Sequence, residues 1–160
     1  MVIIGIDPGF AITGYGIIEK SGSKLKMVDY GAIQTSPKIP FSKRLFSISL
    51  ELDHILSEYR PDCMAIEELF FSKNVKTAIN VAHARGVVLL SAEHHNIPMH
   101  SYTPNQIKSG VSGYGSATKA QVQYMVQKLL NLKEKPTPDD AADGLAIAIC
   151  HAHSARIRSL

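Results

Sequence analysis

Carboxylate side chains stand where a folded sheet would place a functional site. Asp7 follows an apolar run of β-branched residues, and Glu67 ends a second apolar run. Open α/β sheets bind ligands outside the carboxyl ends of their strands, so two acids at such ends could share one site. An aspartate followed by proline and glycine is also typical of a plain turn, and Glu68 would point to the sheet face opposite Glu67. The coincidence of Asp7 with Glu67 favours a site.

A third group of acids begins the last predicted helix, residues 138–153. Asp139 and Asp140 fit a structural role there, because the helix dipole stabilises negative charge near the N-terminus. Asp143 falls on the line of the helix that faces the core, and no basic side chain of the same helix is placed to pair with it before Arg156. An ionised carboxylate is costly to bury unless it is paired or bound to a metal. Asp143 therefore predicts a shared cation.

Four of these acids together suit a metal site. Asp140 and Asp143 are three residues apart and lie on one helix face, where they could join Asp7 and Glu67. Carboxylate oxygens are the ligands that Mg²⁺ and Mn²⁺ prefer. Two such ions about 4 Å apart can activate a water and stabilise the leaving oxygen in phosphodiester hydrolysis. The sequence thus predicts a hydrolase in which the acids hold metal and a water attacks.

The composition allows one compact domain, residues 1–160, because the chain is long enough for one core and too short for two ordinary domains. Lys and Arg number 17 against 14 Asp and Glu, and the resulting net charge of +3 is compatible with nucleic acid without indicating it. Cys63 and Cys150 lie in apolar runs, which favours buried free thiols in a reducing compartment. No stretch approaches the roughly 18 apolar residues of a membrane span, so we expect a cytoplasmic protein.

The elements that must position the acids form two halves. The first half is predicted to be a three-stranded antiparallel meander, because short β-branched runs are separated by turn residues. Strands then alternate with helices, a pattern typical of parallel pairing. We therefore predict a mixed five-stranded α/β sheet. The expected strands are 2–6, 12–19, 25–34, 63–67 and 98–101, and the expected helices are one from about 45 that stops at Arg60, then 74–93, 104–110, 118–130 and 138–153.

Short motifs spread over the whole chain resemble the RuvC family of Holliday junction resolvases. Each is weak alone, but their order and spacing together are specific. The motifs are Ile6-Asp7-Pro8-Gly9, Ala65-Ile66-Glu67-Glu68, Lys73-Asn74, Ala84-Arg85-Gly86, Gly113-Tyr114-Gly115-Ser116-Ala117 and Asp140-Ala141-Ala142-Asp143-Gly144-Leu145-Ala146. The resemblance implies a ribonuclease-H-like fold with helices on both faces of the sheet. It also implies a Mg²⁺-dependent crossover junction endodeoxyribonuclease that acts in homologous recombination and DNA repair.

The resemblance assigns roles as well. The four catalytic, metal-binding acids of the family would map onto Asp7, Glu67, Asp140 and Asp143, with two Mg²⁺ ions per site and Mn²⁺ as a substitute. It selects Asp140 over the neighbouring Asp139, a choice that spacing leaves open. It further implies a homodimer that binds four-way junction DNA and nicks two opposing strands symmetrically, with the RuvA–RuvB branch-migration complex as a partner.

Four further residues resemble DNA-contacting positions of the family. Phe70 and Lys73 follow a strand that ends in a predicted ligand, an arrangement that suits stacking on an unpaired base and contact with phosphate. Lys108 and Lys119 flank the glycine-rich loop 110–116, and Lys119 begins a helix whose free N–H groups favour an anion. Core packing is the alternative for Phe70, and simple solvation is the alternative for the lysines.

The predicted helix 74–93 offers a candidate dimer surface. One stripe along this helix combines small and apolar side chains: Val75, Ile79, Ala82, Gly86 and Leu89. Small residues permit another helix to approach closely, and packing within the chain's own core could use the same stripe. A two-fold dimer through this helix is the prediction that the family resemblance adds.

Three other classes of protein share parts of the pattern. An actin-like or sugar-kinase-like ATPase also begins with an apolar strand, an aspartate and a glycine-rich turn, but such proteins need two lobes to enclose ATP. A YqgF-type resolvase or a ribonuclease H would share the fold and differ in substrate. A catalytically silent DNA-binding domain would not explain why the acids face inward. Length and acids together favour the junction nuclease.

Overall fold

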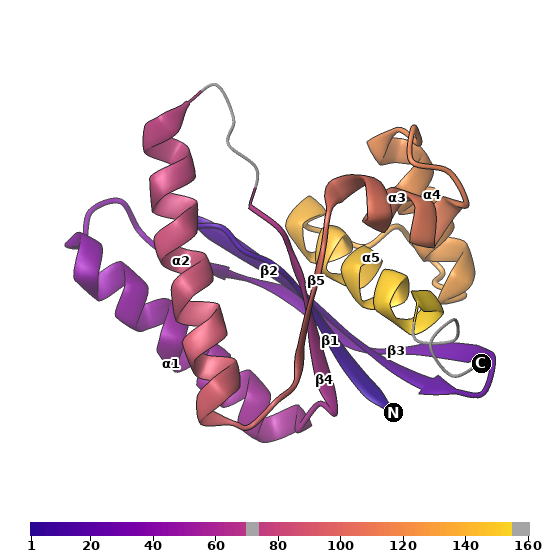
Figure 1. The fold of residues 1–160 in the computed structure, drawn as a ribbon, viewed down its shortest axis with the longest axis horizontal. Coiled ribbons are helices and arrows are strands. Elements are labelled where there is room, and N and C mark those ends of the chain that lie inside the picture. Colours follow the sequence, from indigo (N-terminus) through magenta and orange to yellow (C-terminus); the bar gives the residue numbers. More distant parts are fainter. Residues whose placement is uncertain (70–73, 155–160) are drawn as a thin grey trace.

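A five-stranded sheet lies between two layers of helices in the computed structural model, which describes residues 1–69 and 74–154. In chain order the elements are β1 (Val2–Asp7), β2 (Ile12–Ser21), β3 (Lys24–Gln34), α1 (Phe41–Tyr59), β4 (Cys63–Glu67), α2 (Val75–His94), β5 (Met99–Tyr102), α3 (Pro104–Ser112), α4 (Lys119–Leu129) and α5 (Asp139–Ser154). Helices α1 and α2 cover one face of the sheet, and α3, α4 and α5 cover the other (Figure 1). The predicted α/β architecture is confirmed. No helix in the described ranges is long and apolar enough to cross a membrane.

The strands follow the order β3-β2-β1-β4-β5 across the sheet. The first three strands pair antiparallel, and β4 and β5 continue the sheet in parallel from β1. This confirms the predicted meander followed by parallel strands. The register pairs Ile6 with Ile66. The next residues, Asp7 and Glu67, therefore end two neighbouring parallel strands.

Alternate residues of β1 pack into two separate cores. Ile4 and Ile6 belong to the cluster beneath α1 and α2, together with Ile48. Ile3 belongs to the cluster on the other face, together with Leu145 of α5. Each fully buried isoleucine contributes about 1.5–3 kcal/mol. Because both faces of the strand are buried, its sequence is a continuous apolar run rather than an alternation of polar and apolar residues.

Helix α5 lies with its backbone directly against β2. A side chain at Gly14 would overlap the main-chain oxygen of Asp140, and one at Gly144 would lie 2.5 Å from the carbonyl carbon of Tyr15. Only glycine lets a helix and a strand approach this closely. Gly14 is also the register partner of Asp7. The close contact therefore sets the first turn of α5 beside the end of β1.

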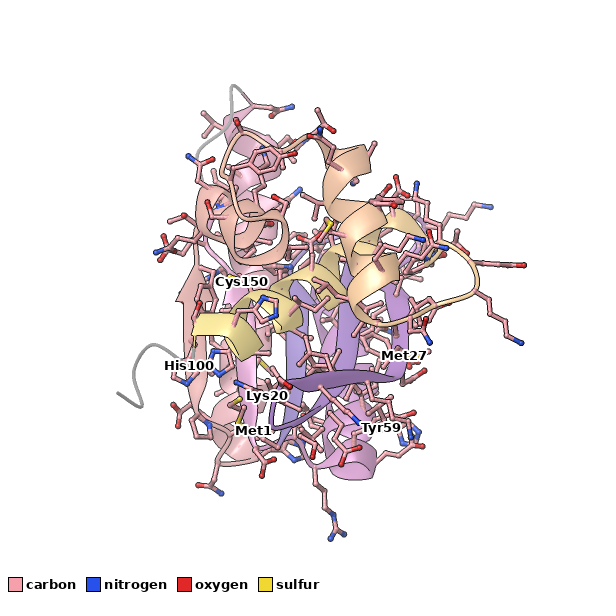
Figure 2. All side chains as sticks on the ribbon, turned by 90° about the vertical axis from the view of Figure 1, so that its right-hand side faces the viewer. Met1, Lys20, Met27, Tyr59, His100 and Cys150 are labelled. Carbon is pink, nitrogen blue, oxygen red and sulfur yellow. The ribbon has the colours of Figure 1, made fainter. Side chains whose placement is uncertain are left out.

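The C-terminal half of α5 is fastened to the sheet and to α3. Lys20 of β2 donates a hydrogen bond to the main-chain oxygen of Ala152. Figure 2 shows Lys20 and Cys150 on this side of the molecule. Cys150 packs against Gly110 of α3, where a side chain would come within 2.8 Å of the Cys150 sulfur. Both Cys150 and Cys63 are buried free cysteines, as predicted. With both ends held, α5 is a rigid support for the acids in its first turns.

Candidate active site

The two strand-end acids lie side by side at the edge where β1 and β4 end. Burial raises the pKa of Asp7 to about 8, and the charges of Glu67, Asp143 and Asp140 and a hydrogen bond with Glu67 add to the effect. Burial also raises the pKa of Glu67, although its hydrogen bond with Asp7 and two nearby lysines act in the opposite direction. Burial and crowded like charges thus favour the protonated form of Asp7.

The chain on either side of these acids is held by short contacts. Thr13 donates a hydrogen bond to the main-chain oxygen of Gly9 at 2.6 Å, which closes the turn after β1. The main-chain N–H of Glu68 donates to the oxygen of Tyr102 at 2.8 Å, so β4 and β5 stay paired past Glu67. Rigid elements on both sides favour a precisely placed site over a mobile one.

Asp143 of α5 is paired with a lysine from another helix. Lys119, the first residue of α4, donates a hydrogen bond from Nζ to Oδ2 of Asp143 at 3.0 Å. Burial raises the pKa of Asp143, and the hydrogen bond and charge of Lys119 offset part of that rise. Burial disfavours the charged Lys119, yet its contact with Asp143 leaves the pKa of Lys119 above its ordinary value. The expectation that Asp143 lacks a basic partner holds within α5 but is wrong for the fold.

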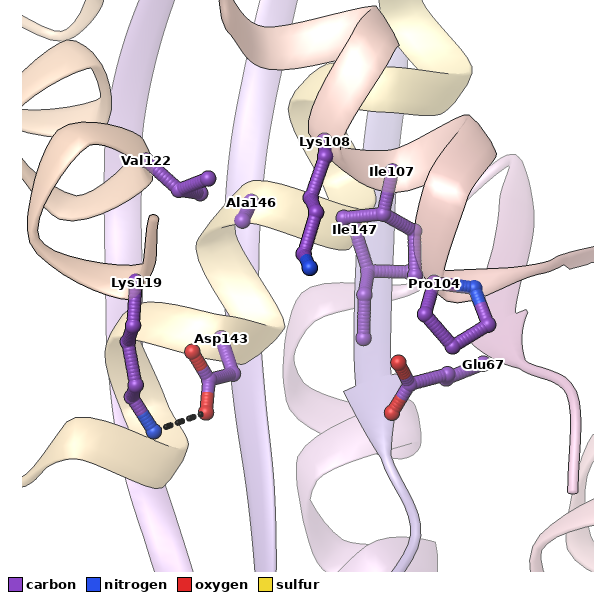
Figure 3. Close-up of a pocket in the computed structure, with 9 residues that line it drawn as sticks. All are labelled: Glu67, Pro104, Ile107, Lys108, Lys119, Val122, Asp143, Ala146 and Ile147. Carbon is purple, nitrogen blue, oxygen red and sulfur yellow. Dashed lines mark hydrogen bonds and ion pairs between the residues drawn. The ribbon is translucent and has the colours of Figure 1, made fainter. Parts of the chain in front are cut away.

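A cavity of about 170 Å³ brings acids and predicted DNA-contacting lysines together (Figure 3). Asp143 of α5 and Lys119 of α4 lie together on one side of it, Glu67 of β4 lies across from them, and Lys108 of α3 points in between. Its remaining wall is mostly apolar and consists of Pro104, Ile107, Val122, Ala146 and Ile147. The two lysines that flank the glycine-rich loop thus line the same cavity as the strand-end acid Glu67. Positive and negative groups facing one small cavity can bind a phosphate and a cation side by side.

Asp139 and Asp140 differ in their surroundings. Asp139 accepts a hydrogen bond from Gln123 at 3.1 Å and lies 3.8 Å from the ammonium of Lys135. Asp140 instead acts on the pKa of Asp7 and lines a second hollow near the end of β1. Asp139 also lies 3.9 Å from the ammonium of Lys119, so it borders the acid cluster, but of the two only Asp140 is among the groups that act on Asp7.

The acidic side chains lie around the site but are not tightly grouped. Within residues 1–69 and 74–154, no group of three or more His, Cys, Asp or Glu side chains is gathered closely enough to enclose a metal ion. The ammonium of Lys119 lies among these acids and offsets part of the repulsion between their charges.

Two of the predicted DNA-contacting residues, Phe70 and Lys73, lie outside the described residues. A functional candidate that the sequence did not reveal is Arg44, which lines the same hollow as Asp140. It stands in the first turn of a surface helix, where an arginine is usually solvated. In the fold, however, Arg44 contacts Thr35 and Phe10, which lie outside its own helix.

The stripe along α2 lies mainly at the surface. Val75 is 61% exposed and Ile79 is 50% exposed, whereas the core of the chain uses Ala84 and Val88 from the opposite side of the helix. Core packing accounts for Leu89, which contacts that core, but not for Val75 and Ile79. Exposed apolar side chains along one helix face are typical of a protein interaction surface.

A mixed five-stranded sheet with strand-end acids and a third acidic segment on the last helix defines the ribonuclease-H-like class of α/β proteins. Residues 3–151 match the RuvC family, crossover junction endodeoxyribonuclease RuvC. The chain therefore belongs to the RuvC family and is a crossover junction endodeoxyribonuclease. The predicted family, fold and activity are confirmed, and the ATPase, the YqgF-type resolvase, the ribonuclease H and the silent DNA-binding domain are set aside.

Relatives match over their full length. The crossover junction endodeoxyribonuclease RuvC of Alkaliphilus metalliredigens is 56% identical over 160 residues, covering 100% of this chain and 98% of the relative. The RuvC of T. thermophilus in complex with Holliday junction substrate is 38% identical with a TM-score of 0.94, covering 99% of this chain and 97% of that one. The yeast mitochondrial Holliday junction resolvase Ydc2 has a TM-score of 0.69 at 16% identity, covering 98% and 82%, which shows the shared fold alone.

Proposed function

We propose that the chain resolves Holliday junctions by nicking two opposing strands symmetrically, in homologous recombination and DNA repair. Family membership supports the substrate, and the T. thermophilus relative forms a complex with a Holliday junction. The cavity lined by two lysines and two carboxylates supports the chemistry, because it can hold the phosphate of a DNA strand beside a cation.

Asp7, Glu67, Asp140 and Asp143 are the proposed ligands of Mg²⁺. The observation that carries this proposal is the convergence of Asp7 and Glu67, at the ends of paired strands, with Asp140 and Asp143 of α5, and the raised pKa of Asp7 agrees with this crowding. Such crowding is unfavourable in the absence of a cation, and a bound divalent ion relieves it. A donor set made only of carboxylate oxygens fits Mg²⁺ or Mn²⁺ and not a soft metal. We propose two ions per site.

When bound, such ions activate a water and stabilise the leaving oxygen of the cleaved phosphodiester. The chain's own groups position that phosphodiester. Lys108 and Lys119 direct their positive charges into the cavity, where they attract the strand and offset charge that develops on the phosphate. The apolar side chains of Ile107 and Val122 form part of the wall. They exclude water, which strengthens the charge interactions inside.

Phe70 and Lys73 are proposed to contact DNA next to the site. Both follow closely on β4, which ends at Glu67. An aromatic ring there could stack on an unpaired base, and the lysine could bind a phosphate of the same strand.

Symmetric nicking of two strands requires two active sites, and we propose that a homodimer supplies them. A two-fold axis brings the same patch of each subunit into contact. The exposed stripe that includes Val75 and Ile79 on α2 is the proposed patch. The family also leads us to propose the RuvA–RuvB complex as a partner, a cytoplasmic location, and a single nuclease domain over residues 1–160.

The test compares four substrates with the purified protein: a mobile four-way junction, a linear duplex of the same sequence, a fixed junction and an RNA–DNA hybrid, each with Mg²⁺ or EDTA. We expect paired symmetric nicks in the junctions with Mg²⁺ and no cleavage of the duplex. Cleavage of the hybrid alone, or junction cleavage that persists in EDTA or in Asp7→Asn, would contradict the proposal.

A further inference from the structure

A hollow of about 480 Å³ adjoins the acid cluster and is separate from the cavity that Lys108 and Lys119 share, because the two have no lining residue in common. Asp140 borders this second hollow from α5, and the turn after β1 borders it through Gly9. Its polar walls come from α1 and α2. The side chains that provide them are Arg44, Thr77 and Asn80.

Arg44 is fixed in place at the border of this hollow. Its Nε donates a hydrogen bond to Oγ1 of Thr35 at 2.9 Å, and Thr35 in turn donates to the main-chain oxygen of Phe10 at 2.7 Å. The guanidinium carbon lies 3.9 Å from the centre of the Phe10 ring, which is itself stacked on Phe41. The plane of the guanidinium is thereby set before any ligand binds.

No carboxylate neutralises Arg44 among the residues that the structure describes, since none lies within 4.0 Å of its guanidinium. The Nε–H of Arg44 donates to Thr35. Its terminal amino groups have no hydrogen-bond partner among residues 1–69 and 74–154. A half-buried, oriented and unpaired arginine is suited to an anion that accepts two parallel N–H bonds.

We infer that Arg44 binds a phosphodiester of the substrate strand in the hollow beside Asp140. This inference rests on the proposed function, because the anion that reaches both hollows is one DNA strand lying across the acids. Lys108 and Lys119 then contact the strand in one hollow and Arg44 contacts it in the other. Thr77 and Asn80 can donate further hydrogen bonds to the same phosphate.

The competing interpretation is that Arg44 only clamps the turn after β1 through Thr35 and Phe10. A clamp would change the stability of the fold and the placement of Asp7. It would not change the number of phosphates that the protein neutralises. The dependence of binding on salt counts those phosphates, so it distinguishes the two roles.

The test measures binding of a fluorescent four-way junction in EDTA over a series of salt concentrations. Arg44→Gln should weaken binding about tenfold and lower the slope of log affinity against log salt by about one. Arg44→Lys keeps the positive charge, so its slope should equal that of the wild type. The matched control is Lys43→Gln, which removes the same charge from an exposed position one residue away on α1 and should leave the slope unchanged.

Two further measurements test the same contact, and the first does not depend on how well Arg44→Gln folds. Asn80→Asp places a negative charge in the same hollow without touching the clamp, and it should weaken binding. A methylphosphonate substitution in the DNA neutralises one phosphate. At the phosphate that Arg44 contacts, it should weaken binding by the wild type and have no effect on binding by Arg44→Gln.

An unchanged slope in Arg44→Gln, or a methylphosphonate profile identical to that of the wild type, overturns the inference. Failure of the wild type itself to bind the junction would instead overturn the proposed function.

Discussion

Nζ of Lys119 lies 3.0 Å from Oδ2 of Asp143 and joins the start of α4 to the second turn of α5. A residue predicted to contact DNA is therefore paired with a residue predicted to hold metal. The pair places a positive charge within the acid cluster. Lys119 can therefore contact the DNA strand, and it also affects the pKa of Asp143.

Replacement of Lys119 by Met should lower single-turnover junction cleavage by roughly a hundredfold, the size expected when one charged group near a reacting phosphate is removed. The pKa of Asp143 should also rise further, because the hydrogen bond from Lys119 lowers it in the wild type. Lys128→Met, which removes a charge from an exposed position of the same helix, is the control and should cleave normally. Cleavage by Lys119→Met within threefold of the wild type would show that the pair is only structural.

Asp7→Asn should stabilise the metal-free protein while abolishing cleavage. The pKa of Asp7 rises from its ordinary 3.8 to about 8 on folding, so between these values the unfolded chain ionises and the folded chain keeps its proton. The free energy of unfolding therefore falls as pH rises through this window, and the full cost is present above about 8. Asparagine avoids this cost and should gain about 1–2 kcal/mol at pH 7.

Urea unfolding in EDTA at pH 4, 7 and 9 measures this difference. The advantage of Asp7→Asn should be small at pH 4 and larger at pH 7 and 9. Glu68→Gln, which changes the acid directly after the end of β4, should keep the pH dependence of the wild type. A variant less stable than the wild type at pH 9 would show that Asp7 is not under strain from its neighbours.

The sequence predicted the strand-end acids well because their positions depend on local pattern. Both β1 and β4 are buried on two faces, so each is a continuous apolar run that ends at a charged residue. The predicted bounds of β4, 63–67, are those of the structure. Pairing of the two strands then follows from the alternation of strands and helices.

Contacts between distant segments could not be predicted in the same way. Lys119 and Asp143 are 24 residues apart and belong to different helices, so helix spacing gave no hint of their pairing. The approach of α5 to β2 also went unnoticed, although Gly14 and Gly16 at alternate positions of one strand were a usable signal of close backbone contact. The surroundings of Arg44 depend likewise on tertiary packing.

Gly144→Ala should destabilise the protein by about 1–3 kcal/mol, because the new methyl group meets the backbone of β2 and neither element can move away cheaply. Cleavage should fall as well, since the first turns of α5 carry Asp140 and Asp143. Gly86→Ala in α2 is the matched control, and both variants are compared in a monomeric background because Gly86 lies on the proposed dimer stripe. Its methyl group meets nothing within 4 Å, so it should gain about 0.5–1 kcal/mol from helix propensity. Equal urea midpoints for the two variants would contradict the close-contact account.

Ile79→Asp should convert the proposed dimer to a monomer that remains folded, because the side chain is 50% exposed in the chain alone and a charge at a buried two-fold contact faces its own copy. Sedimentation equilibrium measures the change. Tyr124→Asp, at a position that is 57% exposed on α4, should stay dimeric. If both variants sediment like the wild type, α2 is not the interface.

The central claim is that Asp7, Glu67, Asp140 and Asp143 hold the divalent ions. Calorimetric titration of Mn²⁺ into the metal-free protein tests it directly, with each acid replaced in turn by its amide and Asp139→Asn as the neighbouring control. We predict that each of the four changes weakens Mn²⁺ binding at least about tenfold, while Asp139→Asn stays within about twofold. Wild-type affinity in the four variants, or a loss in Asp139→Asn as large as that in Asp140→Asn, would contradict the account.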